Sequence, residues 1–183
     1  MAEMSRSGQL EWTQPRVFDR LFQLREGQSP VGTLVWEGVL SRLATVDTVL
    51  GSWEIEEIGL LSRAVEVRDA STGRLVATFM AKLMGDGTLE FADGRLLSWE
   101  SLNFWATDWC FIDETGMQPV MLEEGVTDSS WRDMFRMQYT ATLERSGCSA
   151  REQVMLAALG LYLIYQRRQT AGATTAATTA AVC

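Results

Sequence analysis

The run Val154–Tyr165 is twelve residues long, carries no charge, and constrains the fold more than any other part of the chain. The residues before it, Ser149-Ala150-Arg151-Glu152, form a capping box, in which the Ser and the Glu each satisfy a free backbone N–H. The run ends at Gln166-Arg167-Arg168-Gln169, where cations suit the negative end of a helix dipole. The pattern predicts a helix over residues 149–168.

A helix that is apolar on every face either spans a membrane or is buried on all sides. Twelve residues at about 1.5 Å each give about 18 Å, whereas a bilayer core needs about 20 apolar residues. Charged residues close the run at both ends, so we expect no transmembrane insertion. The sequence therefore predicts a helix at the centre of a core, with Leu156, Leu159 and Leu163 enclosed by strands.

Residues 17–140 contain short apolar runs separated by turn residues, which is typical of many short β-strands. Trp53-Glu54-Ile55-Glu56 alternates apolar and charged side chains, and we expect its glutamates to face solvent. Ala92-Asp93-Gly94 separates two such runs, and Asp-Gly predicts a hairpin with a type I′ turn.

A weak internal repeat joins two parts of this region. Three pairs of segments match at an offset of 55 or 56 residues: Gly32–Trp36 with Gly87–Phe91, Trp53–Ile55 with Trp109–Phe111, and Val65–Val67 with Val120–Leu122. The matches predict two pseudo-repeated halves, 17–80 and 82–140, and closing one half-sheet on the other would remove exposed edges. A two-sheet sandwich covered by the helix is the alternative, but a covering helix should have a polar face.

We expect one domain over residues 16–169, a flexible N-terminal arm over 1–15, and a disordered Ala/Thr-rich tail over 170–183. The N-terminus has no apolar signal segment, so the expected compartment is the cytoplasm. Three cysteines without regular spacing do not form a disulfide framework, and Cys110 is expected to be a buried small hydrophobe. We expect a monomer.

Charge and composition exclude several functions. The net charge of −8 argues against nucleic-acid binding, in which neutralised phosphates supply much of the affinity. The chain has no histidine, which removes Ser-His-Asp and Cys-His catalysis and histidine-based zinc sites. It also lacks a CxxC pair and a phosphate-binding glycine loop. We therefore expect no cofactor, no metal and no enzymatic activity.

Two clusters remain as candidate surface sites. Carboxylates are dense between residues 108 and 128, where they could hold a divalent cation or form a carboxylate pair, or simply solvate a loop. The first of them are Asp108, Asp113 and Glu114. Arg132 and Arg136 form a cationic stripe that could contact an anion or a lipid headgroup, or be an ordinary polar strand face.

The matched segments, together with Ala44–Thr48, Asn103–Phe111 and the helix Val154–Tyr165, resemble the tubby C-terminal-like superfamily. That superfamily includes LURP-one-related proteins, phospholipid scramblases and small bacterial proteins. The resemblance implies a mainly β protein, a closed antiparallel barrel of about twelve strands with the apolar C-terminal helix through its centre. The basic phosphoinositide pocket of tubby proteins and the calcium-binding segment of scramblases have no counterpart here.

The leading functional hypothesis is a non-enzymatic module that binds a protein partner or, weakly, a lipid surface. The second is a membrane-associated, scramblase-like protein whose helix inserts into the bilayer. The third is a hydrolase that uses carboxylates alone.

Overall fold

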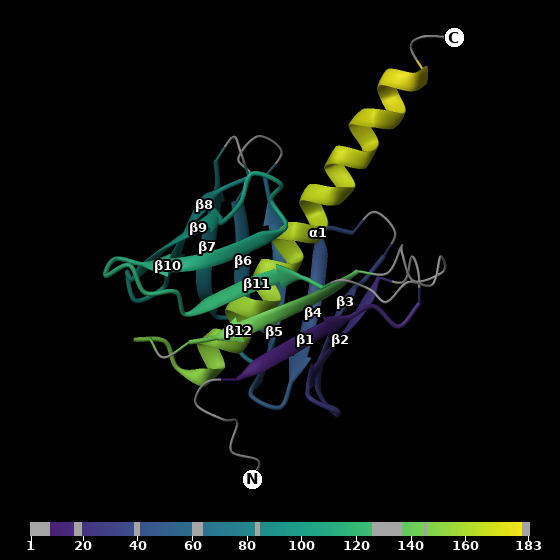
Figure 1. The fold of residues 1–183 in the computed structure, drawn as a ribbon. Coiled ribbons are helices and arrows are strands. Elements are labelled where there is room, and N and C mark those ends of the chain that lie inside the picture. Colours follow the sequence, from purple (N-terminus) through teal and green to yellow (C-terminus); the bar gives the residue numbers. More distant parts are fainter. Residues whose placement is uncertain are drawn as a thin grey trace.

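The structure is a computed structural model that describes residues 8–16, 20–38, 41–59, 64–82, 85–125, 137–144 and 146–180, with side chains as far as residue 170. These described residues form twelve strands and one helix (Figure 1). The strands are β1 (Gln9–Thr13), β2 (Leu21–Glu26), β3 (Ser29–Trp36), β4 (Leu43–Thr48), β5 (Gly51–Ile58), β6 (Ala64–Asp69), β7 (Leu75–Ala81), β8 (Gly87–Phe91), β9 (Leu96–Ser101), β10 (Asp108–Asp113), β11 (Val120–Glu124) and β12 (Gln138–Leu143). The helix is α1 (Ala150–Ala180).

Each strand pairs antiparallel with the next one along the chain, and β1 pairs with β12, so the sheet closes into a barrel. Closure confirms the predicted barrel and excludes the two-sheet sandwich. The closing contact joins Trp12 of β1 to Tyr139 of β12. Both side chains are fully buried, as inward-facing positions of a closed sheet should be.

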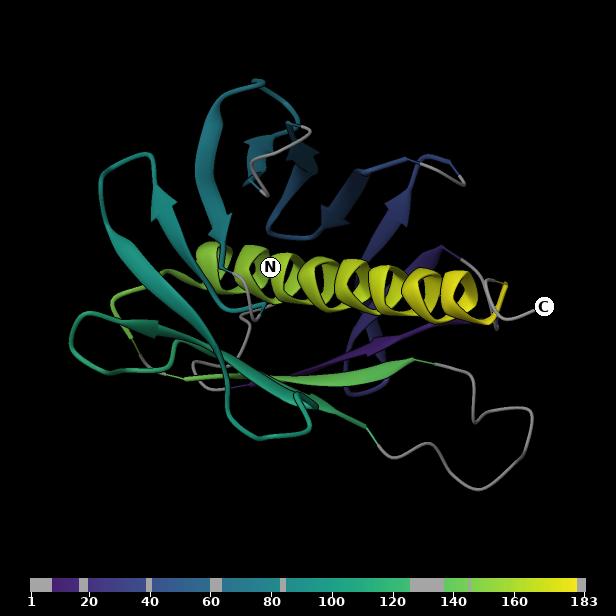
Figure 2. The ribbon, with the colours of Figure 1, turned by 90° about the horizontal axis from the view of Figure 1, so that it is seen from above.

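Helix α1 runs through the barrel from one end to the other (Figures 1 and 2). Leu156 and Leu159 are 0% exposed, and Leu163 is partly buried against the core. The capping box is present: the N–H of Ser149 donates to the Glu152 carboxylate at 2.7 Å, and the N–H of Glu152 donates to Ser149 Oγ at 3.3 Å. The predicted central helix is confirmed.

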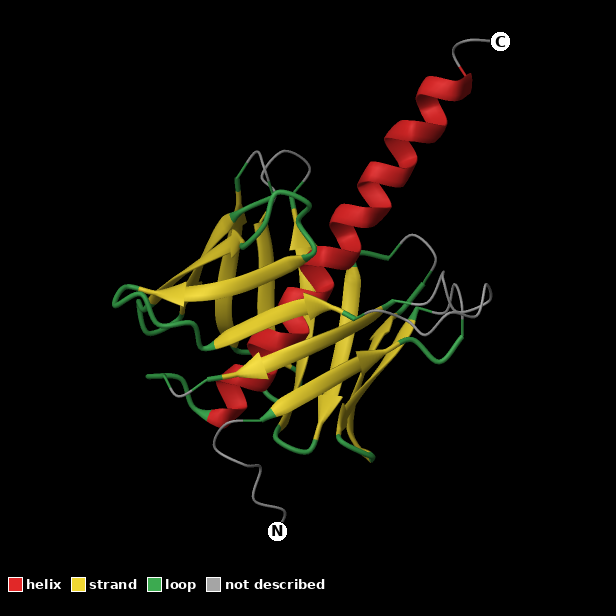
Figure 3. Ribbon diagram, in the orientation of Figure 1, coloured by secondary structure: helices red, strands yellow, loops and turns green. Residues whose placement is uncertain are grey.

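Two predicted boundaries were wrong. Residues 9–13, assigned to a flexible arm, form β1, and its Leu10 and Trp12 side chains enter the core. Helix α1 does not end at residue 168 but continues to Ala180, through much of the segment predicted as a disordered tail (Figure 3). Alanine has the highest helix propensity, and a helix that has already nucleated extends at low cost.

The predicted β8–β9 hairpin is present, but its turn is not type I′. Its loop is Ala92-Asp93-Gly94, closed by a hydrogen bond from the N–H of Phe91 to the carbonyl of Arg95 at 2.9 Å. Only Gly94 has a positive φ, of 88°, in this loop. Three-residue hairpin loops place a type I turn before one left-handed residue, and glycine is suited to that position.

The segments matched in the internal repeat lie five strands apart: β3 with β8, β5 with β10, and β6 with β11. Neighbouring strands are antiparallel, so strands separated by an odd number of steps run in opposite directions. The predicted halves contain β2–β7 and β8–β12, and β1 completes the second set by pairing with β12. The matched segments therefore share a sequence pattern that is typical of strands. Turning one half of the barrel about its axis would not superimpose them on the other half.

The two ends of the barrel differ. We call one the turn end, where hairpins join β2–β3, β4–β5, β6–β7, β8–β9 and β10–β11, and the other the exit end, where α1 leaves the barrel. Connections at the turn end have six residues or fewer, whereas the exit end has the longer connections 14–20 and 125–137. Figure 3 shows the helix projecting past the strands at the exit end.

Polar contacts hold α1 at the turn end. Arg151 Nη2 lies 2.6 Å from Asp69 Oδ2 in the β6–β7 turn, and Glu152 pairs with Arg95 in the β8–β9 turn. Gln153 Nε2 donates to the carbonyl of Pro119 at 3.1 Å. These contacts join the first turn of the helix to three hairpins.

A second set holds α1 at the exit end. The Tyr162 hydroxyl donates to the carbonyl of Arg42 and accepts the N–H of Glu57 at 3.2 Å. Arg168 Nη2 lies 2.7 Å from Glu124 Oε2 at the end of β11. The axial position of the helix is therefore fixed at both ends of the barrel.

Aspartates stabilise the hairpins of the turn end. Asp69 Oδ1 accepts the N–H and the hydroxyl of Ser71 at 3.1 and 2.6 Å. Asp113 Oδ1 accepts the N–H and the hydroxyl of Thr115 at 2.9 and 2.6 Å. Hydrogen bonding by the hydroxyl of Ser71, followed by Arg151, holds the pKa of Asp69 well below its usual range, and the hydroxyl of Thr115 lowers the pKa of Asp113.

We expect the protein to lose stability in acid as these carboxylates are protonated. The pKa of Asp69 is 3.8 in the unfolded chain and lower in the folded protein. The stability that this difference contributes is fully present above pH 3.8 and is lost as the pH falls through the pKa of the folded state. The urea midpoint should therefore fall between neutral pH and about pH 3. Asp69→Asn should flatten this dependence, while the control Glu90→Gln, an exposed change on β8, should retain it. Equal slopes for Asp69→Asn and wild type would contradict the assignment.

Candidate docking surface

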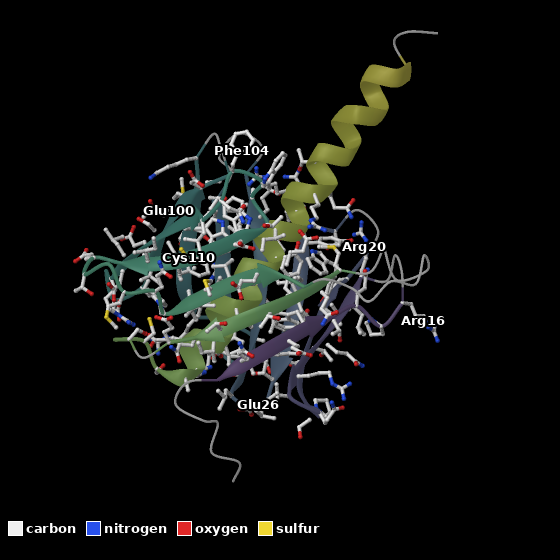
Figure 4. The ribbon with its side chains drawn as sticks, in the orientation of Figure 1. Arg16, Arg20, Glu26, Glu100, Phe104 and Cys110 are labelled. Carbon is white, nitrogen blue, oxygen red and sulfur yellow. The ribbon has the colours of Figure 1, made fainter. Side chains whose placement is uncertain are left out.

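The β9–β10 connection presents two large aromatic side chains to solvent at the exit end. Phe104 is 92% exposed and Trp105 is 80% exposed. Their ring centroids are 5.4 Å apart in an edge-to-face arrangement, and Leu102 beside them is 43% exposed. Figure 4 places Phe104 at the end where α1 leaves and Glu26 at the opposite end. Contiguous exposed apolar side chains, unlike scattered ones, mark interaction sites.

Hydrogen bonds hold this loop in one shape. Asn103 Nδ2 donates to Thr107 Oγ1 and to Asp108 Oδ2, both at 2.7 Å, and its Oδ1 accepts the N–H of Thr107 at 3.0 Å. The Ser101 hydroxyl donates to the carbonyl of Asn103 at 2.7 Å. Ala106 takes a left-handed φ of 54°, which turns the chain back toward β10. The aromatic pair is therefore carried by a preorganised loop, which lowers the entropy lost on binding.

The loop is also joined to the core and to α1. Trp109 Nε1 donates to the carbonyl of Ala106 at 2.9 Å, and the Trp109 ring stacks on Trp99 at 5.2 Å between centroids. The guanidinium of Arg167, on α1, lies 4.8 Å from the centroid of the Trp109 ring. Loop, barrel wall and helix thus meet at Trp109. We call Leu102, Phe104, Trp105 and Arg167 the exit-end patch.

The fold separates the carboxylates that were considered as a candidate surface site. Asp108 and Asp113 lie at opposite ends of β10, with Asp108 at the exit end and Asp113 at the turn end. Asp108 accepts from Asn103 and so supports the aromatic loop, and Asp113 stabilises the β10–β11 turn in which Glu114 is exposed. Within the described part of the chain, no three Asp, Glu, Cys or His side chains are placed to hold a metal ion. Asp108 therefore lies apart from Asp113 and Glu114, and the three do not gather in one carboxylate site.

The other predicted candidates, Arg132 and Arg136, lie outside the described residues. Cys110 is 0% exposed, as predicted, and burial raises the pKa of its thiol to about 11. The thiol is therefore protonated near neutral pH, which disfavours reaction as a nucleophile. Burial likewise raises the pKa of the Tyr162 hydroxyl, to about 12.

The aromatic pair was not among the predicted site residues, because Phe104 and Trp105 belong to Asn103–Phe111, a segment interpreted as part of the barrel. A signal was present. Successive side chains of a strand point to opposite faces, so two adjacent large aromatics cannot both enter the core. Asn103 before them also favours a turn, through hydrogen bonds from its side chain to nearby backbone.

Comparisons with family models, with curated proteins and with solved structures found no match to this chain. No helix within the described residues is long and apolar enough to cross a bilayer.

Proposed function

We propose that the protein is a non-enzymatic binding module that docks through its exit-end patch onto a protein partner or a lipid surface. One observation carries the proposal: Phe104 and Trp105 are exposed side by side on a loop that hydrogen bonds hold rigid. Exposing two aromatic rings to water is unfavourable, and burying side chains of this size contributes about 1.5–3 kcal/mol each. Tryptophan and arginine are also enriched among residues that dominate binding energies.

The position of α1 on the barrel axis favours docking at the outer surface over binding of a ligand inside the barrel. Strand residues and the α1 side chains from Val154 to Tyr165 form one hydrophobic cluster along the barrel axis. Because α1 occupies the centre of the barrel, a partner must bind at the outer surface. The tubby-like resemblance remains a proposal, supported by a closed antiparallel barrel with an apolar C-terminal helix.

The proposal is tested by comparing what immobilised protein retains from a host extract. Wild type is compared with Phe104→Ser/Trp105→Ser and with the control Leu75→Ser/Leu96→Ser, whose original side chains are 38% and 40% exposed at the turn end. Retained proteins are quantified by mass spectrometry and retained lipids by extraction. We expect the exit-end variant to retain at least about tenfold less of the specific material, a loss in the range of a binding hot spot. If all three proteins retained the same material, the proposal would be wrong.

A further inference from the structure

We infer that the surface bound by the exit-end patch is the headgroup boundary of a lipid bilayer, with Phe104 and Trp105 inserted between the headgroups. This inference rests on the proposed docking function and deepens it by committing to one kind of partner. Three properties of the exit end carry it: the shape of the aromatic loop, the distribution of charge, and the path of α1.

The aromatic loop protrudes and presents its rings at an end of the barrel (Figure 4). Tryptophan is enriched at membrane interfaces because its apolar ring and its polar N–H both find suitable surroundings there. The indole N–H of Trp105 can remain among headgroups while the ring of Phe104 enters the acyl boundary. Arg167 lies over Trp109, and its exposed guanidinium can bind a lipid phosphate.

Charge favours the exit end over the turn end for this approach. Among the described residues, six cations nearly balance seven carboxylates at the exit end, whereas carboxylates outnumber cations more clearly at the turn end. The exit-end cations are Arg16, Arg20, Arg42, Lys82, Arg167 and Arg168. The chain as a whole carries −8, so the exit end is the end that an anionic surface repels least.

The path of α1 distinguishes a bilayer from a protein partner. From Gln169 to Ala180 the helix continues beyond the barrel on the same side as the aromatic loop, for about 18 Å at 1.5 Å per residue. No residue after Arg168 is charged. A stable protein interface buries about 800 Å² per partner, and a rigid partner covering that area would have to accommodate the projecting helix. A fluid bilayer can rearrange around the projecting part of α1. Because this part has no charged side chain, it can enter the interface without burying one.

The inference is tested with the full-length protein and vesicles of phosphatidylcholine, with and without added phosphatidylglycerol. Flotation measures partition, and brominated acyl chains test insertion, because bromine quenches tryptophan fluorescence at contact. We expect weak, reversible partition, near the binding constant of about 10⁴ M⁻¹ given by a single acyl anchor. Phe104→Ser/Trp105→Ser should lower partition at least about tenfold, a change of about 1.4 kcal/mol. Leu75→Ser/Leu96→Ser should leave partition unchanged, and Trp105→Phe should abolish the quenching while largely retaining flotation.

Other results would overturn the inference. Absence of wild-type flotation at millimolar lipid, or equal flotation of the exit-end variant, excludes bilayer docking. If the host extract shows a protein retained only when Phe104 and Trp105 are present, the proposed docking function stands and the lipid assignment falls. The same holds if sedimentation shows a concentration-dependent dimer that Phe104→Ser/Trp105→Ser dissociates, since the patch then joins two copies. If the exit-end variant matches wild type in every assay, the docking function falls as well.

Discussion

Leu159→Ala is expected to remove about 2–5 kcal/mol from the free energy of unfolding, because it leaves a cavity on the barrel axis. Leu159 is 0% exposed and lies at the middle of the helical segment that the barrel encloses. A domain of ordinary size is stabilised by about 5–15 kcal/mol, so this change would consume a large share of the total. Guanidinium unfolding followed by tryptophan fluorescence measures the loss.

Leu163→Ala is the matched control, since it deletes the same atoms from the same helix at a position only partly buried. We expect Leu163→Ala to lower the free energy of unfolding clearly less than Leu159→Ala does. Fewer contacts are lost at this position, and the surrounding atoms can relax into the space that the side chain leaves. Equal losses at the two positions would contradict the enclosure of α1 by the barrel.

Gly87→Ala is expected to destabilise the protein by about 1–3 kcal/mol through overpacking. A Cβ at this position of β8 would lie 2.2 Å from Cζ of Phe79 and 2.7 Å from the carbonyl oxygen of Met80. Phe79 is 1% exposed and cannot turn away without displacing other core side chains. Position 87 therefore needs glycine for lack of space, with no requirement for a positive φ.

The control for this prediction is Gly38→Ala, where the nearest atom to an added Cβ is Ser41 Cβ at 3.7 Å, an ordinary contact. Gly38 is likewise outside the positive-φ region. We expect a change within about 0.5 kcal/mol there. Thermal unfolding of the two variants side by side is sufficient, and similar melting temperatures would show that the barrel relaxes around Gly87→Ala.

The sequence predicted the architecture because one of its signals is independent of long-range contacts. The run Val154–Tyr165 is charge-free around its whole circumference and too short to span a bilayer, which leaves burial on all sides. Strand β1 was missed because it is recognisable only from its partner. Its five residues include two core side chains, Leu10 and Trp12, and their pairing with β12 spans almost the whole chain.

The candidate site was harder to predict because the fold determines which side chains gather. Asp108 and Asp113 are close in sequence, yet an extended strand rises about 3.3 Å per residue and carries them to opposite ends of the barrel. Phe104 and Trp105 looked like core residues by type. Only the hydrogen bonds of Asn103 and the left-handed Ala106 turn them toward solvent.

The axial helix also sets the order in which the protein can fold. Its residues follow all twelve strands in the chain, so during synthesis the strands emerge before the segment around which they close. Strands without a core expose apolar faces and unpaired edges, which is the state most prone to aggregation. The rate-limiting step should therefore involve docking of α1 together with the β1–β12 contact, and a chain released before residue 150 should fail to form a barrel. In this protein, the segment that fills the core is synthesised after the strands that enclose it.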